Sequence, residues 1–259
     1  MENANGNNKR YFTPHRVKTE LSCSIFSREY WREAAGELAS ARAIAFAAMI
    51  IALRVAVKMF KIPIGAGLSM TFDCYVNALG SIVYGPLVGL LVGAISDTIG
   101  CILFPTGPYF FPFIFVEMSS SFLFGLFLWR RKISVGRVLC SKLTINLFCN
   151  IFLTSVFMKW MYVFLGDARA ITYNIVNLAR IAKNLVMFPI ESIFIVLVLG
   201  LFMPLLKSLK VVPSTQGELI IKPRHIVMVA VTTVISISLI LFYVFFLKEY
   251  IAANNIKFF

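Results

Sequence analysis

Long apolar segments, separated by short polar or proline-containing turns, fill the sequence from about residue 41 onward. About 20 apolar residues in a helix are needed to cross the ~30 Å hydrocarbon core of a bilayer. Hydrophobic residues make up 59% of the 259 positions and charged residues 14%, whereas a soluble domain has about 25% charged residues. The sequence therefore excludes a soluble domain or a disordered chain, and it predicts an all-α, polytopic bundle of membrane helices.

Seven membrane spans are expected, and the weakest boundary is the Gly85-Pro86 turn between the second and the third. Both spans beside that turn are short for a bilayer core, which favours packing inside the bundle. The expected spans are 41–60, 72–84, 87–104, 111–129, 138–165, 173–206 and 225–247. A loop is expected after the first span, at 61–70, and another at Pro105-Thr106-Gly107-Pro108.

The polar segment 1–40 lacks the basic start and apolar core of a signal peptide and is expected to be a cytoplasmic tail. Residues 26–42 are predicted to form an interfacial helix with its aromatic side toward the membrane. The membrane-facing residues of that helix would be Phe26, Tyr30, Trp31 and Leu38. The expected organisation therefore has three regions: the tail at 1–40, a membrane domain at 41–207, and a linker with one further span at 208–259.

The net charge of +13 requires an explanation on so apolar a chain. Fifteen of the 25 Lys and Arg residues lie on one side of the predicted spans and five on the other. Because basic residues are retained on the cytoplasmic side, the N-terminus is expected in the cytoplasm and the C-terminus outside. This distribution marks the basic residues as topology determinants, so nucleic acid is not an expected partner.

Charged residues inside spans are costly to bury, so each indicates a function. Arg54, Asp97, Glu117 and Arg180 come from four predicted helices and share roughly one depth with Asn184. This convergence predicts a polar pocket that opens to the outside, about a third of the way down.

Two polar stripes support that pocket. On the fifth predicted helix, Lys142, Asn146 and Asn150 share a face, and on the sixth Asn177, Arg180, Asn184 and Glu191 do. For any single asparagine an interhelical hydrogen bond is the simpler explanation. Lys142 and Glu191 are expected to neutralise each other in a structural pair.

The first predicted span has a stripe of alanines opposite Arg54. At 100° per residue the five alanines lie within about 80° of each other. Small residues let another helix approach closely, so the stripe is either a docking surface for a partner or a packing surface within the bundle. The stripe consists of Ala41, Ala45, Ala48, Ala52 and Ala56.

The loop FPTGPYFFP carries three prolines and four aromatic residues. Its aromatic rings would form a wall over a flat ligand, or an aromatic belt at the membrane interface. Phe104, Tyr109 and Phe111 are the candidate stacking residues.

Motifs for enzymatic chemistry are absent from the sequence. It contains no GxxxxGK[ST] loop, HExxH motif or CxxC pair, and neither histidine lies inside a span, His225 being at the edge of the seventh, so no catalytic residue, resident cofactor or metal is expected. Gly85, Gly89 and Gly93 form a packing stripe rather than a phosphate cradle.

Five strings in order resemble the substrate-binding (S) components of energy-coupling-factor vitamin transporters, and most closely the folate-specific subgroup. The resemblance extends over residues 41–207. The strings are IPIG at 62–65, YGPLVGLLVGAISDTIGCILFPTGPYFFP at 84–112, SSSFLFGLFL at 119–128, LTINLFCN at 143–150 and RIAKNLVMFPIE at 180–191.

The resemblance implies a six-helix core that binds a vitamin on its outer side, here followed by one extra C-terminal transmembrane helix. It implies that the alanine stripe docks onto a coupling membrane protein, beneath which two ATPases use ATP. A multi-pass protein of a bacterial cell membrane is the expected setting. For folate, our chemical assignment gives Arg54 and Arg180 to the carboxylates, and Asp97, Asn146, Asn150 and Asn184 to the pterin edge. Phe104, Tyr109 and Phe111 would stack on the ring.

Three alternatives stay open. The chain could be an S component for another vitamin or cofactor precursor, a membrane-embedded lipid-modifying enzyme, or a structural membrane protein without a ligand. The enzyme requires a nucleophile–base pair or metal ligands, which the sequence does not offer. The structural protein would not gather charges in its spans.

Overall fold

The computed structural model describes residues 25–65, 68–105, 110–173 and 178–209, together with residues 211, 212, 216, 219, 227, 230, 231, 234 and 238. Tyr109 and Asn177 lie outside the described residues. So does nearly all of the predicted seventh span, of which five described positions are helical. That span remains a prediction.

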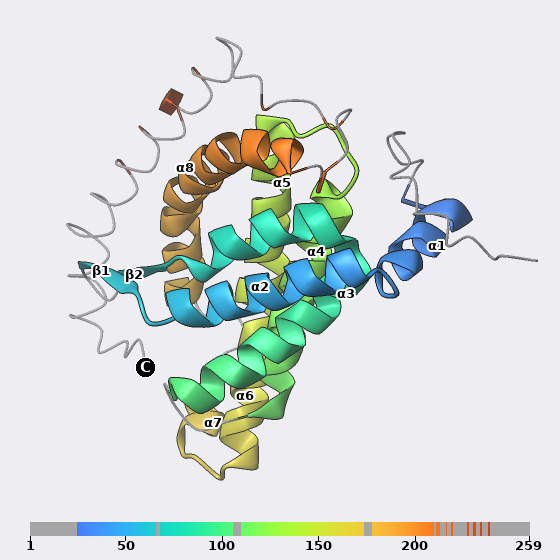
Figure 1. Cartoon of the computed structure of the whole chain (residues 1–259). Coiled ribbons are helices and arrows are strands. Elements are labelled where there is room, and N and C mark those ends of the chain that lie inside the picture. Colours follow the sequence, from blue (N-terminus) through green and yellow to red (C-terminus); the bar gives the residue numbers. More distant parts are fainter. Residues whose placement is uncertain are drawn as a thin grey trace, which may run out of the picture.

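Helices build almost all of the described structure (Figure 1). They are α1 (Arg28–Glu37), α2 (Ala41–Val57), α3 (Asp73–Leu103), the short 3-10 helix η1 (Phe111–Phe113), α4 (Ile114–Leu128), α5 (Val135–Ile145), the π-helix η2 (Asn146–Leu153), α6 (Thr154–Phe164), α7 (Arg169–Thr172) and α8 (Leu178–Ser208). The segment expected as a loop at 61–70 instead forms an antiparallel hairpin of β1 (Lys61–Gly65) and β2 (Leu68–Thr71).

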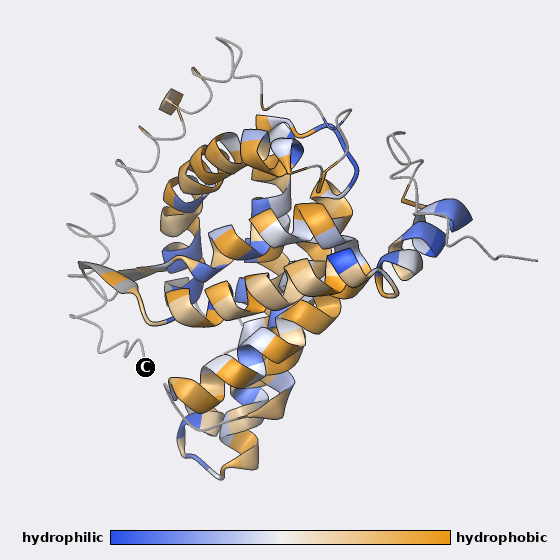
Figure 2. Ribbon diagram, viewed as in Figure 1, coloured by the Kyte–Doolittle hydropathy of each residue, from blue (hydrophilic) through white to orange (hydrophobic). Residues whose placement is uncertain are grey.

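Four helical stretches of the described residues are long and apolar enough to cross a membrane. They are Asp73–Leu103, Phe111–Leu128, Val135–Phe164 and Arg180–Ser208. A fifth results if α1 and α2, which meet at a bend of 71°, are counted as one span. Figure 2 shows apolar residues along these long helices and more hydrophilic residues on α1. The polytopic helical membrane fold is confirmed, whereas the expected count of seven spans is not.

The predicted second and third spans are joined in α3, and the break between them lies where the sequence places it. Gly85 has φ 76° and ψ −173°, which is not helical, and Pro86 follows it. Proline cannot donate the backbone hydrogen bond that would continue the helix across the break. The ribbon reverses direction there, so that the two parts of α3 form a helical hairpin (Figure 1).

Glycines bring α3 and α4 into close contact, as the predicted packing stripe requires. A Cβ at Gly93 would lie 2.7 Å from the Glu117 carbonyl oxygen, and one at Gly125 would lie 2.5 Å from the Pro86 Cα. Both distances are shorter than side chains tolerate, so the two backbones can approach this closely only at glycine.

Two apolar clusters fill the bundle. The larger joins the first part of α3 to α4, α5 and α8, around Phe124, Ile145 and Leu199. The smaller packs α2 on α3, where Ile50 meets Tyr84 and Val88. Close packing of this kind holds the polar side chains of α2, α3 and α4 in one place.

The predicted interfacial helix forms as α1, but its apolar side faces protein rather than membrane. Tyr30 is buried and its ring contacts the Trp129 ring edge-on, with 5.2 Å between centroids. Trp31 stacks on Phe122. Phe26 and Leu38 are exposed, as an interfacial side requires. The expectation for Tyr30 was wrong because a helix amphipathic enough for a membrane surface can equally cover a protein surface.

Replacement of Gly85 by alanine is expected to destabilise the fold. A Cβ at this position would lie 2.8 Å from two ring carbons of Trp129, and the positive φ disfavours every residue with a side chain. A loss on the order of 3 kcal/mol is expected from overpacking and backbone strain together. Thermal unfolding of the detergent-purified protein measures it.

Gly136→Ala is the matched control, because Gly136 lies within helix α5 and a Cβ there would meet nothing within 4 Å. Its melting temperature should equal or exceed that of the unmodified protein. Equal melting temperatures for Gly85→Ala and Gly136→Ala would contradict the role of the break.

Candidate functional site

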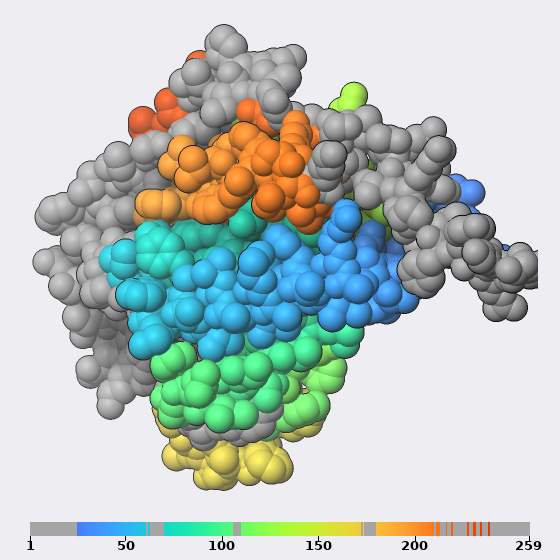
Figure 3. Space-filling model, viewed as in Figure 1, coloured from blue at the N-terminus to red at the C-terminus, as the bar shows by residue number. Residues whose placement is uncertain are grey.

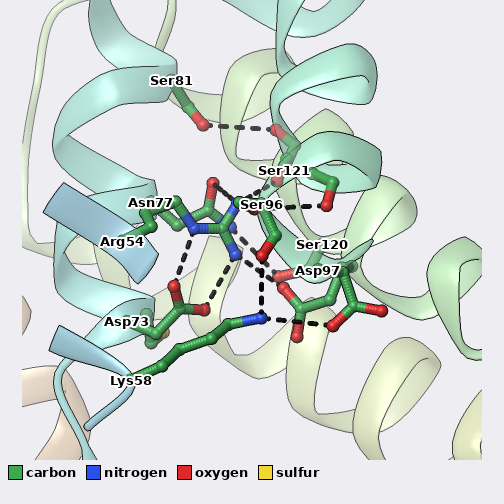
Figure 4. A network of polar contacts seen from close by, with 12 residues as sticks. Arg54, Lys58, Asp73, Asn77, Ser81, Ser96, Asp97, Ser120 and Ser121 are labelled. Atoms are coloured by element: carbon green, nitrogen blue, oxygen red, sulfur yellow. Dashed lines mark hydrogen bonds and ion pairs between the residues drawn. The ribbon is translucent and has the colours of Figure 1, made fainter. Parts of the chain in front are cut away.

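Arg54 lies at the centre of a buried polar network (Figure 4). Its Nε and Nη2 donate to the two carboxylate oxygens of Asp73, each at 2.8 Å. Nη2 also donates to Glu117 Oε2 at 2.7 Å. Nη1 donates to Ser121 Oγ at 3.2 Å and to Asn77 Oδ1 at 3.4 Å. A buried guanidinium is stable only with such partners, and the fork geometry of arginine suits the bidentate contact with Asp73.

Three helices supply the network. Arg54 is in the last turn of α2, Asp73 begins α3 directly after the β-hairpin, and Glu117 is in the first turn of α4. Asn77 follows Asp73 by one helical turn and therefore faces the same way. The network thus fixes α2 against the start of α3 and against α4.

A second ion pair lies beside the first. Lys58 Nζ donates to Asp97 Oδ1 at 3.2 Å and to the Ser96 carbonyl at 3.4 Å. Gly100 leaves room for the Lys58 side chain, because a Cβ at position 100 would lie 2.8 Å from Lys58 Cδ. In Figure 4 the Lys58 ammonium points toward Asp97 below the Arg54 network. Two cations and three carboxylates therefore meet in this region.

The structure brings three of the predicted pocket residues together, but binds them to each other and to residues that were not predicted. Arg54 and Glu117 are direct partners, and Asp97 is close by through Lys58. The expectation that Arg54 awaits a ligand carboxylate is not favoured, because Asp73 and Glu117 already occupy its donors.

Sequence reasoning missed Asp73, Asn77 and Ser121, and it counted Lys58 only as one of the five basic residues on the outer side. The i, i+4 spacing of Asp73 and Asn77, which places both on one face of a helix, was the available signal. Asp73 does not stand out in the sequence as a buried charge, because it lies at the edge of its span, where a charge is not costly.

A separate polar cluster joins η2 to α8, as the two predicted stripes require. Asn146 Nδ2 donates to the Asn184 carbonyl at 3.4 Å, and Asn150 Nδ2 donates to Asn146 Oδ1 at 3.1 Å. Asn184 Nδ2 donates to the Arg180 carbonyl at 3.0 Å. Asn184 therefore belongs to this cluster, and Arg180 contributes its backbone carbonyl to it. We call these four residues the asparagine cluster.

The asparagine cluster lies on unusual backbone. Asn146 and Asn150 are both within the π-helix η2, which interrupts a stretch that is otherwise α-helical from Val135 to Phe164. Such π-helical insertions are rare and are frequently found at functional sites. Asn146 is buried, whereas Asn150 and Asn184 are partly exposed and retain hydrogen-bonding capacity toward a ligand.

The expected pair of Lys142 and Glu191 forms, with 2.8 Å between Lys142 Nζ and Glu191 Oε2. Lys142 Nζ also contacts Cys74 Sγ at 3.2 Å. This pair connects α5 to α8. Lys142 also connects α5 to the first turn of α3, where Cys74 follows Asp73.

The aromatic loop is only partly described. Phe104 is partly buried at the C-terminal end of α3, and Tyr109 is outside the described residues. Phe110 contacts Phe113, Trp160 and Phe164. Phe111 is 60% exposed and contacts Phe115 edge-on. These rings form an aromatic surface between the start of α4 and the end of α6, compatible with either predicted role.

All five alanines of the predicted stripe are exposed on α2. Four of the five buried residues of α2 lie on the opposite side, at Ala43, Ala47, Ile50 and Arg54, and the fifth is Val55 in the last turn. In Figure 3 this helix forms an open band across the visible face of the molecule. The alanine stripe therefore does not pack inside the bundle, which was one of the two explanations left open. Binding of a partner stays a prediction.

Within the described residues, no group of three or more His, Cys, Asp or Glu side chains could hold a metal ion.

A family model described as "ECF-type riboflavin transporter, S component" matches residues 38–211. The chain belongs to this family. It is accordingly a multi-pass membrane protein among transporter subunits rather than among enzymes. Helix α1 precedes the matched region, and the predicted seventh span follows it.

Two relatives and a solved structure refine the comparison. The chain is 31% identical to a folate transporter FolT from Clostridium novyi (strain NT) over 118 residues, which are 46% of this chain and 64% of that one, a little under two thirds. It is 31% identical to a FolT from Leuconostoc mesenteroides over 153 residues, 56% of this chain and 77% of that one. A crystal structure of FolT bound with folic acid matches with a TM-score of 0.50 and 25% identity, covering 59% of this chain and 88% of that one.

Replacement of Arg54 by alanine is expected to destabilise this S component strongly, because Asp73 and Glu117 would be left buried without a cation. Removal of one partner of a buried ion pair costs about 3–5 kcal/mol. Thermal unfolding in detergent provides the measurement. The control is Arg169→Ala, which breaks the exposed pair with Asp167 and should cost no more than about 1 kcal/mol. Similar losses for both variants would show that the Arg54 network does not stabilise the bundle.

Proposed function

We propose that the chain is the folate-binding S component of an ATP-driven energy-coupling-factor transporter and takes up folate across a bacterial cell membrane. The observation that carries this proposal is the similarity to FolT bound with folic acid, which spans 88% of that chain. Both curated relatives are folate transporters as well. The five strings that resemble the folate-specific subgroup lie within the region matched by the family model.

The asparagine cluster is the part of the site best suited to folate. A pterin ring presents both donors and acceptors along one edge, and an asparagine side chain offers one acceptor and two donors. Asn150 and Asn184 would bind that edge, with Asn146 holding them in position. Arg180 would bind a carboxylate of the glutamate tail. Phe104 and Tyr109 would stack on the ring.

The Arg54 network would support the site from beneath without binding the ligand directly. Arg54 has its donors occupied, and Asp97 is held by Lys58. Glu117, whose side chain is 30% exposed, is the member of the network nearest to solvent. This revises the ligand roles first given to Arg54 and Asp97.

Transport would need partners. The exposed alanine stripe would dock onto a coupling membrane protein, and two ATPases would use ATP, since the sequence has no P-loop of its own. The excess of Lys and Arg in the segments that precede α2 and follow α4 and α8 supports a cytoplasmic N-terminus.

Riboflavin is the second candidate ligand, because the family model that matches 38–211 carries that vitamin in its description. Riboflavin has a flat ring but no carboxylate. Arg180, one helical turn before Asn184, would suit a carboxylate and therefore favours folate, which carries two.

Titration calorimetry of the purified, detergent-solubilised protein with folic acid should give saturable binding in the absence of ATP. Riboflavin under the same conditions should give none. The heat of binding reports the ligand directly, and a parallel titration with pteroate, which lacks the glutamate, shows what the tail contributes. Saturable binding of riboflavin without binding of folic acid would overturn the folate assignment.

Replacement of both Ala48 and Ala52 by tryptophan should abolish folate uptake by cells that contain the whole transporter, while the binding of folic acid by the purified variant is unchanged. Two indole rings on the stripe would prevent close approach of a partner helix. Val163→Trp is the control, because Val163 is 60% exposed on α6, away from α2, and uptake should persist. A loss of ligand binding in the double variant would contradict a docking role.

A further inference from the structure

The turn between α4 and α5 holds four basic residues that differ in how they are paired. Arg130, Arg131 and Lys132 follow the end of α4 at Leu128, and Arg137 lies in the first turn of α5. Because both flanking helices are long and apolar enough to span the membrane, residues between them lie at the depth of the lipid headgroups.

Arg130 is used internally. Its guanidinium pairs with Glu33 and, at 3.0 Å, with Glu37, both on α1. It also lies over the Trp129 ring at 4.7 Å from the centroid. These contacts hold Arg130 in its unusual conformation at φ 48°. The same contacts occupy Glu33 and Glu37, the acidic side chains of α1 that face the turn.

Arg131, Lys132 and Arg137 have no such compensation. None of them forms an ion pair with any residue that the structure describes. Arg131 Nε is buried and has no hydrogen-bond partner in that part of the chain. Arg137 Nη1 donates to the Lys132 carbonyl at 2.7 Å, which keeps its guanidinium beside the turn. Three cations are therefore gathered within seven positions, and one has a buried donor unsatisfied.

We propose that Arg131, Lys132 and Arg137 form a binding surface for the phosphate group of an anionic phospholipid of the cytoplasmic leaflet. Like charges held together repel each other unless an anion compensates them. A phosphodiester supplies the charge and several acceptor oxygens at the right depth. Guanidinium groups suit phosphate because they can donate two parallel hydrogen bonds.

Helix α1 contributes indirectly to this surface. Glu33 and Glu37 pair with Arg130 and so connect α1 to the turn. Since α1 precedes the region matched by the family model, this arrangement is not implied by membership of the family. The proposal is also independent of which vitamin the protein binds.

The test is a titration of the full, detergent-solubilised chain with phosphatidylglycerol and with phosphatidylcholine of the same acyl chains, in which bound lipid is counted by native mass spectrometry. Phosphatidylglycerol should bind more tightly. Arg131→Gln combined with Arg137→Gln should weaken its binding on the order of twenty-fold, because each cation near the surface contributes roughly a factor of five. The matched control is Arg28→Gln with Arg32→Gln, which removes two exposed cations of α1 and should change binding less than two-fold.

Several results would overturn the proposal: equal binding of the two lipids, equal losses in the two double variants, or displacement of phosphatidylglycerol by millimolar glycerol phosphate. Unchanged lipid binding with lost uptake would assign the surface to a protein partner instead. If the glutamine variant does not fold, Arg131→Lys with Arg137→Lys keeps both charges but loses the paired guanidinium donors, and it should still bind phosphatidylglycerol more tightly than phosphatidylcholine. Equal binding of the two lipids by the lysine variant would likewise contradict the proposal.

Discussion

The buried guanidinium of Arg54 is the constraint on which the arrangement of the first three long helices depends. A cation without exposure to water must be surrounded by acceptors, and only side chains from other helices can supply them. Asp73 binds it with both oxygens from the start of α3, and Glu117 binds it from α4. Because hydrogen bonds of this kind are directional, α2 can neither rotate nor slide without breaking several of them.

This constraint explains why α2 has two different sides. With Arg54, Ile50, Ala47 and Ala43 turned inward, the alanine stripe must face outward, because the two sets lie half a turn apart. Apolar residues alone would not determine this orientation, since lipid tails are as apolar as the bundle interior and give little preference for one side. A single charged residue thus determines which face of the helix is available to a partner.

The sequence indicated several of the buried polar residues, but not how they would pair. Span boundaries, the break at Gly85, the alignment of Asn146 with Asn184 and the Lys142–Glu191 pair follow from hydropathy and helical spacing, which are local properties. Pairing is non-local, so the residues of one expected pocket lie in two clusters, and Lys58, expected only as an outer basic residue, forms an ion pair with Asp97. Tyr30 was misplaced for a related reason, because periodicity shows that a face is apolar and not what covers it.

The first turn of α3 is the point at which the two halves of the polar interior meet. Asp73 faces α2 and α4 through Arg54, while its neighbour Cys74 contacts Lys142, which pairs with Glu191 on α8. Successive helical residues point about 100° apart, so one turn can contact both sets of helices. The same turn directly follows the β-hairpin, whose last residue is Thr71. The hairpin is therefore joined, through two adjacent residues, to helices on both sides of the bundle, whereas the hydrogen bonds of Asn146 join η2 to α8.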